Sequence, residues 1–86
     1  MEGRIVRSLA GRDKGYFLVV VSQDGNFLSV CDGKERPLAR PKRKNIKHLA
    51  LTNTVLNRSE YETDKQLRKA LAVYRASVWK GRNQDV

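Results

Sequence analysis

The sequence predicts a small, mainly β fold: a barrel of about five short antiparallel strands, followed by a C-terminal amphipathic α-helix. Short apolar runs recur about every ten residues between glycine-containing polar turns, a spacing that suits a small barrel better than a sandwich, which needs more strands. The chain has 86 residues, enough for one domain with a small core. Apolar residues at helical spacing appear only near the C-terminus.

Residues 1–21 predict two strands joined by a tight loop. The pair Ile5-Val6 supplies the first apolar positions, and the run Tyr16–Val21 is aromatic and β-branched with one Leu, which suits a pleated, largely buried strand. Between them lies the polar loop Gly11–Gly15, with a glycine at each end. Because Gly adopts positive φ without a Cβ penalty, the chain can reverse sharply there and bring its backbone close to a ligand. Arg12 and Lys14 are then carried into solvent.

The next predicted elements form an antiparallel meander. Asp24-Gly25 is a strong hairpin signal between two apolar runs. A third strand follows at Phe27–Cys31, and Asp32-Gly33 repeats the turn chemistry. The segment His48–Leu51 alternates polar and apolar residues, so it predicts a last short strand that pairs back to close the barrel.

Residues 34–47 are strongly basic. Pro37 and Pro41 exclude a helix and a central strand there, and Leu38 and Ile46 are the only large apolar anchors, so the sequence predicts an extended edge segment or an exposed arm. The segment holds one acid, Glu35, and seven Lys and Arg residues, which give it a net charge of +6: Lys34, Arg36, Arg40, Lys42, Arg43, Lys44 and Lys47.

The strand, the Gly-x-Asp-Lys-Gly loop and the apolar strand that follows resemble the KOW motif of ribosomal proteins and NusG-type transcription factors. The segment Pro41–Leu49, PKRKNIKHL, resembles the one that closes the KOW domain in large-subunit ribosomal protein fourteen of the archaeal and eukaryotic type, a family that short bacterial KOW proteins also resemble. The resemblance covers Gly3–Leu51. It implies an SH3-like barrel over residues 1–52 that lies with its loop and basic residues against rRNA.

Matched residue by residue, the resemblance carries RNA contact over to these positions: Gly11, Asp13, Lys14, Gly15, Lys42, Arg43, Lys44, Asn45, Lys47 and His48. Their charge and neighbouring positions add Arg12, Arg36 and Arg40 to the candidate site. The chain departs from the ribosomal family in its brevity, and a capped helix replaces the usual long basic extension. Either a ribosomal component or an accessory translation factor is compatible with this pattern.

The tail predicts a linker and a helix. Residues 53–62 are polar and loop-like, and Thr63 with Gln66 forms a capping box at the start of a helix over residues 63–80. Four apolar residues recur at helical spacing and predict a face that packs on the barrel or on a partner: Leu67, Leu71, Tyr74 and Val78. Gly81 is the predicted C-cap, and residues 81–86 are predicted to fray.

Composition limits the partners and the compartment. The net charge is +9 and the pI about 10.2, which favours a polyanion: nucleic acid first, an anionic membrane surface second. The single cysteine, Cys31, excludes an internal disulfide and fits a reducing cytosol. The longest apolar run, Tyr16–Val21, is too short to span a membrane, and no signal peptide is evident. We therefore expect a soluble cytoplasmic protein.

Catalytic and metal-binding patterns are not evident. One His and one Cys, on different predicted elements, do not suggest a nucleophile with its base, so Cys31 is interpreted as a buried structural thiol and His48 as a phosphate neighbour. No Cys pair, His pair or carboxylate cluster suggests a metal, and the glycine loop lacks the ending of a nucleotide-binding P-loop. No cofactor is expected. Phe17 and Phe27 suit core packing, whereas Tyr16 is left open between packing and base stacking.

The leading hypothesis is therefore a non-catalytic, monomeric RNA-binding protein associated with the ribosome or another ribonucleoprotein. It would contact structured RNA through phosphates, with no membrane and no small-molecule substrate. The alternative is a protein-binding SH3-like adaptor of the transcription or translation machinery, which predicts an exposed aromatic groove rather than a basic face. The basic segment can also be read as a charged loop that only aids solubility.

Overall fold

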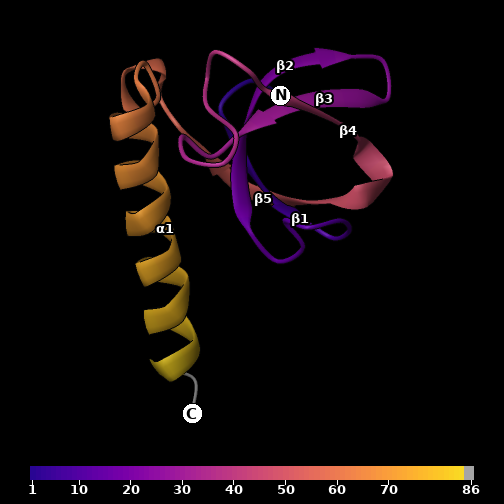
Figure 1. Ribbon diagram of the computed structural model, residues 1–86. Helices are drawn as coiled ribbons and strands as arrows, with labels where there is room; N and C mark the ends of the chain where they lie inside the picture. Colours follow the sequence, from indigo (N-terminus) through magenta and orange to yellow (C-terminus); the bar gives the residue numbers. More distant parts are fainter. Residues whose placement is uncertain (85–86) are drawn as a thin grey trace.

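The protein is mainly β, as predicted: a five-stranded antiparallel sheet with one C-terminal helix (Figure 1). A computed structural model describes residues 1–84, and their side chains as far as residue 78. The sheet contains strands β1 (Arg4–Ser8), β2 (Phe17–Asp24), β3 (Phe27–Cys31), β4 (Lys42–Asn45) and β5 (Leu49–Val55). Two short 3-10 turns, η1 (Ile46–His48) and η2 (Arg58–Glu60), and the helix α1 (Asp64–Gln84) complete the chain.

The strand order is β4-β3-β2-β1-β5, so the first four strands form a meander and β5 returns to pair with β1. The edge strands β4 and β5 are joined along the chain by the three residues of η1. The hairpin between β2 and β3 turns at Gly25, which has φ +60°, as the Asp24-Gly25 pattern predicted.

Both faces of the sheet are buried, because alternate residues of each strand point to opposite sides. One set forms the inner core: Val6, Leu18, Val20, Leu28, Val30 and Leu49. Leu28 on β3 and Leu49 on β5 share this cluster although β2 and β1 lie between their strands in the sheet. The sheet must therefore curl strongly around its inner face, as Figure 1 shows.

The other face carries the helix-side core: Ile5, Val19, Cys31, Tyr61, Leu67 and Leu71. Leu67 and Leu71 of α1 are completely or almost completely buried there, and Tyr74 packs against the same cluster. Of the two possibilities that the sequence left open, the helix therefore docks on the sheet of its own chain. The predicted capping box is also present, because Thr63 Oγ1 accepts the Gln66 N–H and Gln66 Oε1 accepts the Thr63 N–H, both at 3.1 Å.

Three predicted boundaries were wrong. The strand β5 continues to Val55, past the predicted end of the barrel at residue 52, because Thr52 and Thr54 still alternate with exposed residues along the edge of the sheet. The predicted linker contains Tyr61, which is 9% exposed and belongs to the helix-side core. The helix runs through Gly81 to Gln84, since the loss of about 1 kcal/mol in helix propensity at a glycine need not end a helix. The last two residues of the predicted frayed tail lie outside the described residues.

No helix in the described part of the chain combines the length and the apolar character needed to cross a membrane.

Candidate nucleic-acid interface

The loop Gly11–Gly15, which the resemblance predicted to be a KOW loop, is a compact, hydrogen-bonded projection between β1 and β2. The Gly15 N–H donates to Ser8 O at 2.8 Å, the Ser8 N–H donates to Tyr16 O at 2.9 Å, and the Tyr16 N–H donates to Asp13 O at 2.9 Å. Gly15 has φ +89°, a conformation that a residue with a Cβ adopts only with strain. The loop therefore offers Arg12 and Lys14, both exposed, from a fixed backbone.

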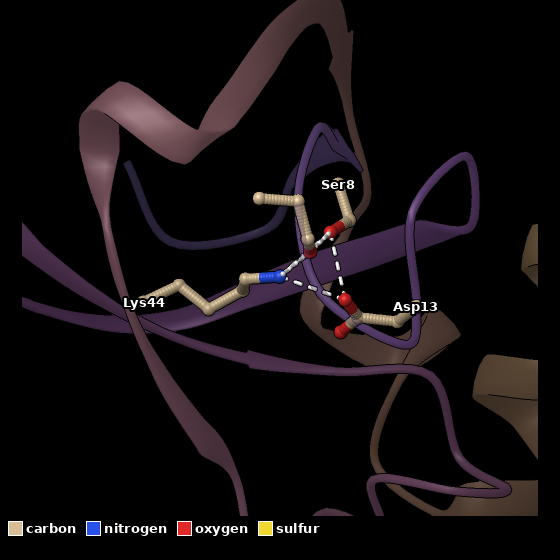
Figure 2. A network of polar contacts seen from close by, with 4 residues as sticks. Ser8, Asp13 and Lys44 are labelled. Atoms are coloured by element: carbon tan, nitrogen blue, oxygen red, sulfur yellow. Dashed lines mark hydrogen bonds and ion pairs between the residues drawn. The ribbon is translucent and has the colours of Figure 1, made fainter.

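A buried polar network lies beneath this loop (Figure 2). Lys44 Nζ of β4 donates to Asp13 Oδ1 at 2.7 Å, to Ser8 Oγ at 2.6 Å and to Ala10 O at 2.9 Å. Ser8 Oγ also lies 2.8 Å from Asp13 Oδ1. The Lys44 and Asp13 side chains are only 7% and 11% exposed, so all three ammonium hydrogens have partners inside the protein.

The network joins the two halves of the candidate site. Asp13 and Lys44 are 31 residues apart along the chain, one in the Gly11–Gly15 loop and the other in the basic segment. Burial raises the pKa of the Asp13 carboxyl, but the hydrogen bonds from Lys44 and Ser8 and the Lys44 charge outweigh it and lower the pKa below its ordinary value. Removing either partner leaves the other as an unpaired buried charge, which is strongly destabilising.

The position of Lys44 follows from the register of β4. Lys44 pairs with Leu28 and Lys42 with Val30, two inward-facing residues of β3. Arg43 and Asn45 pair with Ser29 and Phe27 and therefore share the opposite face. The sequence-based assignment of Lys44 and Asp13 as RNA contacts is corrected here, since both side chains are occupied inside the protein.

Most of the other predicted cations are available to a ligand. Besides Arg12 and Lys14, three Lys and Arg side chains of the candidate site are exposed: Arg40, Arg43 and Lys47. His48, next to Lys47 in η1, is exposed as well. Lys42 and Arg36 are half-buried. The Leu9 N–H donates to His48 O at 2.9 Å, so η1 lies directly against the chain that leads into the Gly11–Gly15 loop. Lys47 and His48 are thus brought close to the loop cations.

The turn after β3 approaches the other side of the loop. The Asp32 carboxylate accepts the Lys34 N–H at 2.9 Å and the Arg36 N–H at 2.8 Å, which fixes this turn. Arg36, Arg12 and Tyr16 line a hollow of about 300 Å³ together with Asp13, Asp32 and Glu35. The structure therefore brings Arg36 to the loop, whereas Arg40 does not belong to the lining of this hollow.

Asn45 has a structural role in addition to its place in the motif. Its side-chain oxygen accepts the Lys47 N–H at 3.0 Å and caps η1. The cap fixes the turn that carries Lys47 and His48, so Asn45 positions these residues. Its amide N–H groups make no hydrogen bond within the described residues.

Phe27 lies outside the core, contrary to the sequence-based interpretation. It is 37% exposed, and the Arg43 guanidinium lies 4.2 Å from the centroid of its ring, within the range of a cation–π contact. The sequence could have indicated this, because Phe27 begins its strand one residue after the hairpin turn and alternates with the inward-facing Leu28. Phe17, by contrast, packs at the edge of Tyr74, with ring centroids 5.1 Å apart.

The two residues with nucleophile or base chemistry lie apart. Cys31 is buried in the helix-side core, and burial, with contributions from Asp64 and Asp32, raises its pKa to about 11. Its thiol is thus neutral and inert near pH 7, whereas His48 is exposed on η1. Among the described residues, no three His, Cys, Asp or Glu side chains are grouped to bind a metal ion.

Comparison with protein-family models and with curated proteins found no match for this chain. The resemblance to KOW proteins therefore rests on the loop Gly11–Gly15 with its flanking strands and on the segment Pro41–Leu49.

Proposed function

We propose that this protein is a non-catalytic RNA-binding protein that contacts the phosphates of structured RNA, with rRNA as the favoured partner and translation in the cytoplasm as the setting. The observation that carries the proposal is the Asp13–Lys44 ion pair. It ties the KOW loop to the basic strand β4, so the cations of two distant segments are offered from one rigid body. The protein acts as a monomer in this proposal.

The chemistry of the surface agrees with this function. Arg can bind a phosphate through two parallel N–H groups, and Lys binds it as a point charge. A-form RNA hides the base edges of its major groove, so a small basic surface recognises helix shape, phosphates and 2′-hydroxyls. Arg12, Lys14 and Lys47 are exposed and lie on a loop and a turn whose backbones are fixed by hydrogen bonds, which lowers the entropy lost on binding. We expect weak sequence specificity.

The test is the salt dependence of binding to a hairpin RNA. About five phosphate contacts give a slope of about −3.5 to −4.5 in a plot of log K against log salt concentration. Replacing Arg12 and Lys14 with Ala removes two contacts and should flatten this slope by about 1.4 to 1.8 units.

A matched control removes equal charge elsewhere. Arg58→Ala with Lys69→Ala takes two charges from η2 and from the side of α1 that faces it, and should leave the slope unchanged. A slope near zero for the unmodified protein, or equal flattening by both pairs, would refute phosphate contact through the loop.

A second candidate function is a protein-binding adaptor of the transcription or translation machinery. A groove of about 500 Å³ lies between β5, η2 and α1, and its largely apolar lining includes Leu56, Val73 and Tyr74. Val73 and the nearby Val55 are 64% and 54% exposed. Under this alternative, Val73→Asp abolishes capture of a polymerase or ribosomal protein partner, and RNA binding is absent.

A further inference from the structure

Tyr16 is an exposed aromatic ring on a fixed support. Its side chain is 55% exposed, although it stands immediately before the buried part of β2. Its backbone N–H donates to Asp13 O and its carbonyl accepts the Ser8 N–H, both at 2.9 Å. The adjacent Phe17 packs at the edge of Tyr74 on α1. The ring is thus presented to solvent from a backbone anchored on both the loop and the helix.

A second hollow lies on the side of Tyr16 that faces the helix. This groove, which we call the Tyr16 groove, has a volume of about 560 Å³ and lies between Gly15-Tyr16, the turn at residues 32–35 and α1. Its cations are Lys34, Arg68 and Arg75, which outnumber its two acids, Asp32 and Glu35. The volume falls within the range of about 300 to 1,000 Å³ that is usual for clefts that bind small ligands.

The walls of the Tyr16 groove are held in place. Arg68 Nη1 donates to Gly33 O at 2.7 Å, which attaches the turn to the helix. One carboxylate oxygen of Asp32 accepts the backbone N–H groups of Lys34 and Arg36. This acid therefore stabilises the turn. Lys34 and Arg75 are exposed and form no ion pair within the described residues. An aromatic face and two free cations therefore meet in one groove.

We propose that the Tyr16 groove takes a single unpaired nucleotide of a structured RNA, with its base stacked on Tyr16 and its phosphate bound by Arg75 and Lys34. The inference rests on the proposed RNA-binding function and adds a class of RNA: helices interrupted by a bulged or looped-out nucleotide. Stacking of a base on an aromatic ring tolerates any sequence, because every base has a π face. The helix α1 is then one wall of the RNA site as well as a cover for the sheet.

The test compares two RNA hairpins that differ only in one bulged nucleotide. We expect the protein to bind the bulged hairpin about tenfold more tightly than the fully paired one, because the bulged base adds one stacking contact with an aromatic ring. Tyr16→Ala should remove this preference and leave the affinity for the paired hairpin unchanged, which also shows that the variant folds. Tyr16→Phe keeps the aromatic face and should keep the preference. A 2-aminopurine base at the bulge should lose fluorescence on binding to the unmodified protein and to Tyr16→Phe only.

The contribution of the helix has a matched control. Arg75 and Lys69 both lie on α1, but Arg75 lines the Tyr16 groove and Lys69 lines the groove beside β5. Arg75→Ala should reduce the preference for the bulge, and Lys69→Ala should not.

Each outcome decides the inference. Equal affinity for the two hairpins, or a preference that survives Tyr16→Ala, overturns it while leaving the proposed RNA-binding function intact. Binding to neither hairpin overturns both.

Discussion

The buried Lys44–Asp13 pair can be tested by replacing Lys44 with Met, which is also long and unbranched but carries no charge. The substitution leaves the Asp13 carboxylate buried, with Ser8 as its remaining partner on Oδ1. Oδ2 has no hydrogen-bond partner among the described residues even in the unmodified protein. The Asp13 carboxylate must then take up a proton, become exposed to solvent through movement of the loop, or remain buried without a counter-charge.

The expected loss of stability is large for so small a domain. Breaking a buried ion pair by removing one partner costs about 3 to 5 kcal/mol. A chain of 86 residues has a total unfolding free energy of roughly 4 to 13 kcal/mol at about 0.05 to 0.15 kcal/mol per residue. Lys44→Met should therefore remove about a quarter or more of the stability. The exposed Lys47→Met is the matched control and should change stability by no more than about 0.5 kcal/mol.

Equilibrium urea unfolding measures this loss, and a double-mutant cycle assigns it to the pair. Asp13→Ala alone should also be strongly destabilising, because it leaves the Lys44 ammonium buried. The double variant should be more stable than the sum of the two single losses implies, by about 1 to 3 kcal/mol. Equal midpoints for Lys44→Met and Lys47→Met would refute the structural role of the network.

The same pair gives a pH dependence with a defined sign. The pKa of Asp13 is lower in the folded protein than in the unfolded chain, so the pair contributes fully above the unfolded carboxyl value of about 3.9. This contribution is lost as the pH falls from that value through the folded pKa. The difference in stability between the unmodified protein and Asp13→Ala should therefore shrink below about pH 4. A difference that grows on acidification would contradict the assignment.

Two further predictions concern the helix and the turns. Leu71→Ala should cost about 2 to 4 kcal/mol in urea unfolding, because Leu71 is 1% exposed between the helix and the sheet; an unchanged midpoint would mean that docking of α1 does not stabilise the fold. Gly33→Ala should be more destabilising than Gly15→Ala, although both sites have positive φ. A Cβ at Gly33 would lie 2.6 Å from Asp64 O, whereas a Cβ at Gly15 meets nothing within 4 Å; equal losses would show that the turn can move away from the helix.

Local patterns predicted the framework of the fold correctly. The short apolar runs of β1 to β3, the Asp24-Gly25 turn and the Thr63–Gln66 capping box each determine structure through neighbours in the sequence. The apolar face of α1 could be predicted in the same way, since Leu67 and Leu71 are one helical turn apart. Each of these patterns spans only a few residues, so it can be recognised from the sequence alone.

The candidate interface was harder to predict, because the orientation of its side chains depends on strand register. Lys42–Asn45 contains no apolar residue, so no hydropathy alternation shows which of its side chains point inward. Only the pairing of Lys44 with Leu28 sends its ammonium under the loop to Asp13. The Phe27–Arg43 contact is set by the same register, since Phe27 pairs with Asn45. Likewise, the sequence places Tyr61 in a polar linker, and Tyr61 is buried only because α1 packs on the sheet.

The most direct test of the central claim is ultraviolet crosslinking in cells, followed by sequencing of the bound RNA and mass spectrometry of the crosslinked peptides. The account predicts enrichment of structured RNA, with rRNA foremost, and crosslinks in the peptides that contain Gly11–Tyr16 and Arg43–His48. The charge-matched variants separate specific from incidental contact: Arg12→Ala with Lys14→Ala should reduce the RNA recovered, and Arg58→Ala with Lys69→Ala should not. RNA recovery at background level, or crosslinks confined to peptides outside these two segments and the Tyr16 groove, would contradict the account.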